Sequence, residues 1–176
     1  PLHNEKHANT KIQNGINVEF LKTQHLVPVV AHEFARVANE FPMSFVKNNE
    51  TGQFQAVAMF GLEPGENLFV KDGKWTAAFA PMATTRYPLG LVRHPQEEQY
   101  GIVIDEASPL VGETEGNALF ENGEETDYLK RRKEALVSFI EFSHVTEAFT
   151  KYLADKELLV AQTLTVDIKG EKKDIN

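Results

Sequence analysis

The sequence predicts an α+β protein in which an antiparallel strand meander packs with an N-terminal amphipathic helix and a C-terminal helical region. Three observations lead to this fold class: helical spacing of apolar residues near residues 28–41, short apolar runs separated by turn residues over 43–104, and renewed helical spacing over 128–156. Strands grouped together, with helices before and after them, are typical of α+β folds and not of parallel βαβ sheets. A length of 176 residues is typical of a single domain covering residues 1–176.

The first helix is predicted over residues 29–39. Apolar residues recur there at helical spacing, Phe34 and Val37 among them. Pro28 suits a first helical turn, because the N–H that proline lacks would be unpaired there. Pro42 cannot continue a helix and disfavours helical geometry in the residue before it. The two prolines therefore bound one amphipathic helix.

The middle of the chain is predicted to be a meander with tight turns. Six short runs have the composition and period of strands: residues 43–47, 54–60, 67–70, 75–79, 87–92 and 100–104. Their connections hold Gly52, Pro64-Gly65 and Asp72-Gly73. Asp-Gly between two apolar runs is a strong hairpin signal, and Pro-Gly suits the centre of a type II turn. A polar loop, 93–99, separates the last two strands.

The remaining segments are predicted from their composition. Apolar stripes over 128–156 indicate two helices with a break near 143–146, where Thr146 would cap the second helix. Residues 158–168 alternate and predict a last strand, and residues 18–21 predict a short one. The polar ends, 1–15 and 170–176, are expected to be loose tails.

Composition limits the function classes. The chain has 18 Lys and Arg against 26 Asp and Glu, so its net charge is −8, which argues against a nucleic acid or an anionic membrane as the main partner. No cysteine is present, so disulfides and thiolate chemistry are excluded. No apolar run approaches the ~20 residues of a membrane span, and the first residues lack the apolar core of a signal peptide. We therefore expect a soluble protein, cytoplasmic by default.

Catalytic motifs are lacking. His32-Glu33 is followed by Phe34, Ala35 and Arg36, so the metal-binding HExxH pattern fails at its last position. No Gly-x-Ser-x-Gly elbow and no phosphate-binding glycine loop occurs. The sequence predicts no cofactor and favours a protein that is not an enzyme.

An acidic loop, 112–127, is a weak candidate for calcium. Calcium takes six to eight oxygen ligands, and four carboxylates of the loop are candidates: Glu113, Glu115, Glu121 and Asp127. The EF-hand pattern is absent, so a solvated acidic loop is the simpler interpretation and no metal is predicted.

Arg86 is the charged residue whose setting is hardest to explain. Apolar residues surround it in the run AFAPMATTRYPLGL, and an unpaired buried charge is costly. We expect Asp105 or Glu106 to pair with it, as a structural ion pair; the alternative is a ligand anchor for a carboxylate or phosphate. The candidate ligand-binding set consists of polar and aromatic residues in or beside the predicted strands: Glu66, Asn67, Trp75, Arg86, Tyr87 and Asp105.

Several sequence motifs of the chain resemble those of the SapC family of bacterial proteins. The resemblance runs over about residues 27–168 and rests on HLVPVVAHEFARVANEFP, on GLEPGENLFVKDGKW, on the Arg86-Tyr87-Pro88 triplet, and on GIVIDEASPLV followed by EGNALF. Leu89 departs from the family's preference for Phe after Tyr-Pro. Family members tend to continue for several tens of residues past the last strand, so the resemblance implies a C-terminal continuation that this chain lacks.

The resemblance implies a general biological role for the protein but no specific chemical reaction. The family takes its name from a surface-array (S-layer) locus, and its members tend to occur near flavin-dependent tryptophan halogenases and outer-membrane receptors. It therefore implies an accessory, cell-surface-associated protein whose partner is a protein or a surface component. It supplies no catalytic residues.

Two functional hypotheses follow. The first is a non-catalytic binding, assembly or S-layer-associated accessory protein. The second is a small-molecule-binding accessory or an enzyme with a pocket near Glu66, Asn67, Trp75, Arg86 and Asp105. Convergence of these residues on a concave pocket would favour the second hypothesis.

Overall fold

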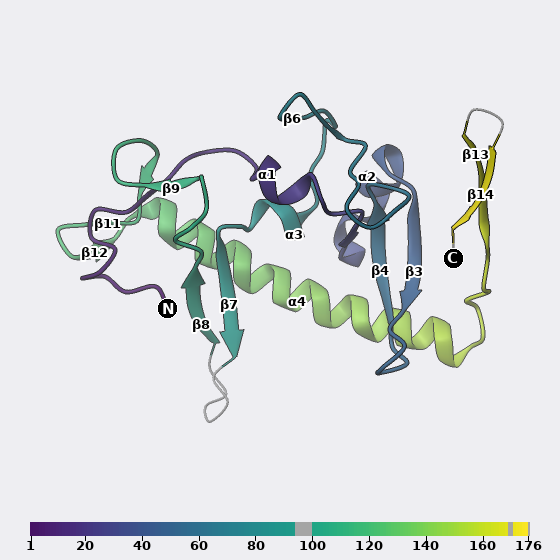
Figure 1. Cartoon of the computed structure of the whole chain (residues 1–176). Coiled ribbons are helices and arrows are strands. Elements are labelled where there is room, and N and C mark those ends of the chain that lie inside the picture. Colours follow the sequence, from purple (N-terminus) through teal and green to yellow (C-terminus); the bar gives the residue numbers. More distant parts are fainter. Residues whose placement is uncertain (94–99, 169–170, 176) are drawn as a thin grey trace.

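The computed structural model describes residues 1–93, 100–168 and 171–175, and its centre is one long helix. Helix α4 (Asp127–Asp155) crosses the molecule diagonally in Figure 1. Small antiparallel sheets lie along it, with a three-stranded sheet toward its C-terminal end and a hairpin toward its N-terminal end. The arrangement is a mixed α+β structure with antiparallel strands, as the sequence predicts.

Helix α4 is continuous where the sequence predicted a break. Thr126 caps its start, since its side-chain oxygen accepts a hydrogen bond from the Leu129 N–H at 3.2 Å. The hydroxyls of Ser143 and Thr146 donate to the carbonyls four residues earlier, at 2.7 and 2.6 Å. These hydroxyls are therefore satisfied inside the helix, and Thr146 does not act as a cap.

The three-stranded sheet confirms the first predicted hairpin. Its strand order is β2 (Leu26–Pro28), β4 (Phe54–Met59), β3 (Met43–Lys47). Gly52 has φ +71°, and the Asn48 side chain accepts hydrogen bonds from two N–H groups of the turn. The turn residues in the sequence therefore identify both the loop and the register of β3 and β4.

The predicted N-terminal helix is present only in part, because it begins later than expected. Pro28 ends strand β2, and the N–H of Val29 donates to Ala56 at 3.0 Å, so this backbone belongs to the sheet. A single turn of 3₁₀-helix, η1 (Ala31–Glu33), follows, and α2 (Phe34–Glu40) has only seven residues. A proline that suits a helix start suits an edge strand equally well.

The segment of residues 18–21 forms a helix instead of the predicted strand. Helix α1 (Val18–Leu21) begins after Asn17, whose side chain accepts a hydrogen bond from the Phe20 N–H at 3.1 Å. Asparagine at this position satisfies an N–H that a strand would leave unpaired.

The second predicted hairpin is present but short. Strands β5 (Val70–Lys71) and β6 (Lys74–Trp75) pair across Asp72 and Gly73, which have φ +49° and +68°. Positive φ at both central residues is the geometry that Asp-Gly favours. The rest of the predicted strands 67–70 and 75–79 is irregular, because the aromatic residues there pack into a core instead of pairing.

Two apolar cores lie on either side of the molecule's middle. One joins α2 to the three-stranded sheet and is rich in aromatic rings that contact one another in tilted or T-shaped pairs: Phe41, Phe60, Phe69 and Trp75. The other lies under the hairpin of β7 (Leu89–Arg93) and β8 (Tyr100–Ile104). The predicted strand 100–104 is confirmed, whereas residues 94–99 of the predicted loop lie outside the described residues.

The chain's N-terminal segment is not a loose tail. Strand β1 (Lys11–Ile12) lies between β9 (Val111–Gly112) and β10 (Asn117–Ala118), and Ile12 is buried in the second core. The acidic loop continues as a small hairpin of β11 (Phe120–Glu121) and β12 (Glu124–Glu125). At the other end, β13 (Leu164–Ile168) pairs with β14 (Glu171–Ile175), so the expected C-terminal tail contains a strand.

A buried carboxylate joins η1 to the short helix α3 (Met82–Thr85). Glu33 is 3% exposed, and its two carboxylate oxygens accept hydrogen bonds from the N–H groups of Val30 at 3.2 Å and Met82 at 2.9 Å. Burial raises the pKa of the Glu33 carboxyl, and the two N–H donors oppose that shift only in part. Since α3 ends beside Arg86, this carboxylate helps to fix where Arg86 lies.

The raised pKa of Glu33 predicts how stability depends on pH. Between the ordinary carboxyl pKa and the raised one, the folded state holds a proton that the unfolded chain has lost, so stability falls as pH rises through this window. The free energy of unfolding of wild type, minus that of Glu33→Gln, should therefore decrease from pH 4 to pH 8 in urea titrations. Glu134→Gln, on the exposed face of α4, is the matched control; an equal slope for both variants would contradict the prediction.

Gly61 predicts a second stability effect. A Cβ at this position would lie 2.4 Å from the backbone carbonyl oxygen of Glu66, a contact that only a backbone shift can relieve. Gly61→Ala should cost about 1–3 kcal/mol of unfolding free energy, the usual cost of overpacking. Gly112→Ala is the control, because nothing lies within 4 Å of its Cβ position. Equal denaturation midpoints for the two variants would contradict this expectation.

Candidate functional site

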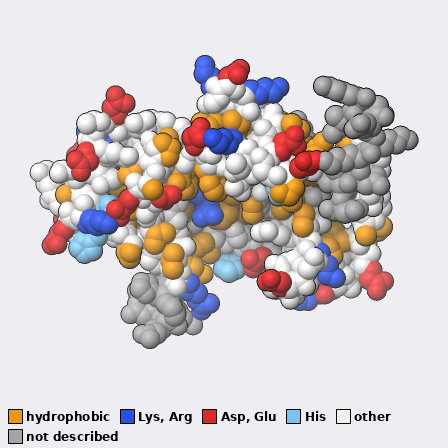
Figure 2. All heavy atoms as spheres, in the orientation of Figure 1, with side chains coloured by type: hydrophobic (Ala, Val, Ile, Leu, Met, Phe, Trp, Pro, Cys, Tyr) orange, Lys and Arg blue, Asp and Glu red, His pale blue; other side chains and the backbone are white. Residues whose placement is uncertain are grey.

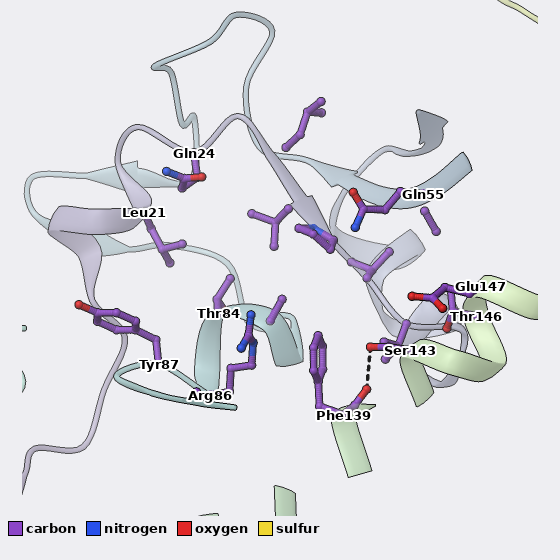
Figure 3. Close-up of a pocket in the computed structure, with 18 of the residues that line it drawn as sticks. Leu21, Gln24, Gln55, Thr84, Arg86, Tyr87, Phe139, Ser143, Thr146 and Glu147 are labelled. Atoms are coloured by element: carbon purple, nitrogen blue, oxygen red, sulfur yellow. Dashed lines mark hydrogen bonds between the residues drawn. The ribbon is translucent and has the colours of Figure 1, made fainter. Parts of the chain in front are cut away.

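A pocket of about 740 Å³ lies between the two cores. Its walls are the end of α1, strand β2 and the segment after it, the β3–β4 turn with the start of β4, the β7–β8 hairpin, α3 and the middle of α4. The close-up in Figure 3 shows side chains from these elements pointing toward a shared space, with Arg86 and Phe139 on one side and Ser143, Thr146 and Glu147 along α4. Volumes of ~300–1,000 Å³ are typical of small-molecule sites.

Arg86 brings a positive charge into this pocket. It follows α3 directly, and its guanidinium carbon lies 4.8 Å from the centre of the Phe139 ring. Its Nε is buried and has no hydrogen-bond partner among the described residues. Burial accordingly lowers the pKa of the Arg86 guanidinium. The cation–π contact offsets part of the desolvation but leaves the Nε–H unsatisfied.

The ion pair expected for Arg86 is not formed within the described chain. Asp105 accepts the hydroxyl of Tyr87 and the N–H of Ala107. Glu106 instead pairs with Lys6 and His7 of the N-terminal segment. Both carboxylates are thus used by other groups, because β8 ends in a turn that directs them toward Tyr87 and toward the N-terminus.

Tyr87 and Asp105 form the rim of the pocket beside the hairpin. The Tyr87 ring stacks on Phe20, with 5.6 Å between ring centroids. Burial, together with the hydrogen bond to Asp105, raises the pKa of the Tyr87 phenol. Tyr87 is therefore a protonated donor near neutral pH, held in place by its carboxylate partner.

Helix α4 supplies pocket residues that sequence reasoning missed. Phe139, Ser143, Thr146, Glu147 and Thr150 all line the pocket and follow the spacing of one helical face. Thr146 also accepts the Ala31 N–H at 2.7 Å, so it fixes the start of η1 against the helix. The signal in the sequence was a polar interruption of an apolar stripe, which had suggested a break between two helices.

Three of the predicted site residues lie elsewhere. The Glu66 carboxylate accepts the Leu62 N–H at 2.8 Å within its turn. Trp75 packs in the first core and donates to the Phe79 carbonyl. Asn67 is buried and donates to the Leu21 carbonyl at 2.7 Å, so it supports a pocket wall from behind. The structure thus brings Arg86, Tyr87 and Asp105 together at the pocket, and places Glu66, Asn67 and Trp75 outside its lining.

A second cavity, of about 60 Å³, adjoins Arg86 on the side of α4. Arg132 lines it as well and donates to the backbone carbonyls of Arg86 and Tyr87, at 2.8 and 3.3 Å. These bonds fix the backbone that carries Arg86. They also place a second cation near it, which adds to the local positive potential.

The acidic loop does not assemble a metal site. Across residues 1–93, 100–168 and 171–175, no three histidine, aspartate or glutamate side chains gather as metal ligands would. The four carboxylates proposed for calcium are spread over the segment from β9 to β12 and the start of α4. Another acidic residue of the loop, Glu125, pairs with Lys133 at 2.8 Å.

None of the helices in the described part of the chain combines the length and apolarity of a membrane crossing.

The surface around the pocket is mixed in character. On the face shown in Figure 2, acidic and basic side chains are interspersed, and hydrophobic side chains gather in a band across the middle of the molecule. That band runs where the two halves of the structure meet along α4 in Figure 1.

Comparison with known proteins identifies a family. No curated protein and no solved structure matches the chain. The SapC family model matches residues 2–176, which is nearly the whole length, and the order of motifs from Pro28 through the Arg86-Tyr87-Pro88 triplet lies within that match. The chain therefore belongs to the SapC family.

Proposed function

We propose that this SapC protein is a non-catalytic binding protein, and that its pocket takes a small organic anion whose carboxylate pairs with Arg86. The observation that carries the proposal is the Arg86 guanidinium, which has no ion-pair or hydrogen-bond partner among the described residues, while Arg86 lines a 740 Å³ pocket. An unpaired, partly buried charge is costly. A bound anion would pair with that charge.

Charge selects the class of anion. Arg86 is the one basic residue among the lining residues, which also include Asp105 and Glu147. A dianionic phosphate would meet more negative than positive charge there, whereas a monoanion matches the single guanidinium. The planar fork of arginine also suits the two oxygens of a carboxylate.

The remaining lining favours an apolar body on the ligand. Leu21, Val27, Val29, Pro88 and Leu89 all border the pocket. Burial of apolar ligand surface against them would contribute about 25 cal/mol per Å² removed from water. The carboxylate would then orient the ligand, and the apolar contacts would supply most of its affinity.

The surface-associated accessory role that the family resemblance implies is part of the same proposal. A pocket of this kind would let the protein hold a ligand for a partner at the cell surface without transforming it. The competing proposal of an enzyme requires a general base or nucleophile beside Arg86. Asp105, one of the two carboxylates in the lining, already accepts two hydrogen bonds, which favours the binding proposal.

Isothermal titration calorimetry with hexanoate and phenylacetate tests the proposal. Wild type should bind both, and Arg86→Gln should weaken binding about tenfold or more, since a hydrogen bond to a charged group contributes about 1.5–3 kcal/mol. Arg131→Gln, an exposed change on α4, is the control and should leave affinity unchanged. Phosphate and chloride should bind more weakly than the carboxylates.

The design separates loss of binding from loss of folding. Arg86→Gln removes an unsatisfied buried donor, so its melting temperature should not fall. Ser143→Phe keeps Arg86 but fills the space beside Phe139, and it should also weaken hexanoate binding. The proposal is wrong if neither carboxylate binds wild type, or if Arg86→Gln binds both with unchanged affinity. It is also wrong if chloride binds and the carboxylates do not, because that result would indicate a small anion in the 60 Å³ cavity and not a ligand in the large pocket.

A further inference from the structure

The pocket is elongated along α4. Phe139, below the Arg86 guanidinium, and Glu147 are eight residues apart on this helix and both line the pocket. At about 1.5 Å of rise per residue, they are separated by about 12 Å along the helix axis. Figure 3 shows Ser143 between them, with Glu147 at the opposite end from Arg86.

The two ends of this groove carry opposite charges. In Figure 3, Arg86 lies toward one end of the groove and Glu147 toward the other, with Phe139 and Ser143 between them. Apart from a 3.7 Å contact with the exposed His144, which is an ion pair only when that histidine is protonated, Glu147 has no acid–base partner among the described residues. An occupant that carries an anionic group and a cationic group about 12 Å apart would complement both ends.

Strand β2, which lines the pocket, pairs with another strand on one side only: its partner among the described strands is β4. The bonds from Phe60 N–H to the His25 carbonyl and from Val29 N–H to the Ala56 carbonyl direct the odd-numbered residues of this segment toward β4. By the alternation of antiparallel pairing, the N–H and C=O of Leu26 and the C=O of Pro28 point away from β4.

An extended peptide fits this combination better than a simple acid does. Leu26 and Pro28 both line the pocket, and an exposed strand edge can receive the backbone of an extended peptide. An extended chain covers at most ~3.3–3.6 Å per residue, so the axial distance of about 12 Å between Phe139 and Glu147 corresponds to about three or four residues. Glu147 is exposed, with 75% of its side-chain surface accessible, so it is solvated in the free protein. The tail of a fatty acid, in contrast to a peptide, would form neither backbone hydrogen bonds with β2 nor an ion pair with Glu147.

We propose that the anion bound by Arg86 is the C-terminal carboxylate of a free peptide of about three or four residues, which lies along β2 with its N-terminal ammonium group at Glu147. This inference rests on the proposed function and names its ligand class. Gln24 and Gln55, which point toward the pocket in Figure 3, provide further amide groups for the peptide backbone. The apolar lining receives the peptide's side chains.

Chemical capping of one peptide tests both ends. Calorimetry would compare Ala-Val-Leu-Ala with its N-acetylated and its C-amidated forms, and with decanoate. In wild type, amidation should weaken binding about tenfold, the same loss as Arg86→Gln, and should have no further effect in that variant. Acetylation should weaken binding about two- to fivefold in wild type, as expected for a partly exposed charge pair, and should have no effect in Glu147→Gln.

The controls distinguish the two proposals. Glu141→Gln changes an exposed glutamate of α4 outside the pocket and should behave as wild type toward all three peptides. If decanoate binds through Arg86 at least as tightly as the peptide, or if acetylation costs as much in Glu147→Gln as in wild type, the peptide assignment is wrong and the carboxylate pocket stands. If neither decanoate nor the peptide responds to Arg86→Gln, both proposals are wrong.

Discussion

The length of α4 is the constraint on which the rest of the structure depends. Leu129 and Leu136, near its N-terminal end, are buried in the core beneath the β7–β8 hairpin. Thr146 and Thr150, further along the same helix, are buried beside η1 and the three-stranded sheet. The helix therefore spans two separately packed groups of strands, and the distance between these groups is fixed by how far apart their anchor residues lie on it.

The pocket is a consequence of that spacing. Between Leu136 and Thr146 neither core reaches the helix fully, and the gap is lined by Phe139 and Ser143. Interiors are normally packed closely, with few voids larger than a water molecule, so a space of about 740 Å³ at this point requires walls that cannot collapse. The α4 helix holds them apart, and the Ser143 and Thr146 hydroxyls are satisfied within it by the carbonyls four residues earlier.

The position of Arg86 is fixed by contacts of its backbone more than by contacts of its side chain. Arg132 donates to the carbonyls of Arg86 and Tyr87 from one side, and Glu33 accepts the Met82 N–H at the start of α3 from the other. A charged residue anchored in this way does not need an internal carboxylate to be placed. Among the described residues, its guanidinium is left with the Phe139 ring and without an ion-pair partner. In the proposed function, a bound anion would supply that partner.

The parts of the fold that could be predicted are those determined by residues that lie close together in the sequence. The β3–β4 and β5–β6 hairpins follow from Asn48, Gly52, Asp72 and Gly73, because φ and side-chain bonding at a turn are decided within a few residues. Pro28 was misassigned because helix starts and edge strands tolerate it equally, and only pairing with β4 decides between them. Arg86 could be identified as unusual from its apolar neighbours. Its lack of a partner depends on where β8 directs Asp105 and Glu106, which is a tertiary property.

The same contacts favour binding over chemistry at this pocket. Tyr87 and Asp105 are hydrogen-bonded to each other, and the raised pKa of the phenol makes Tyr87 a weak proton donor. Catalytic acid–base groups work best with a pKa near the working pH and with access to the reacting atom. Tyr87 lacks the first property, and Asp105, which already accepts two hydrogen bonds, is poorly placed for the second. In the proposed function a ligand would meet the Arg86 guanidinium, strand β2 and the apolar wall between them, and these groups would hold it by charge, hydrogen bonds and apolar contact.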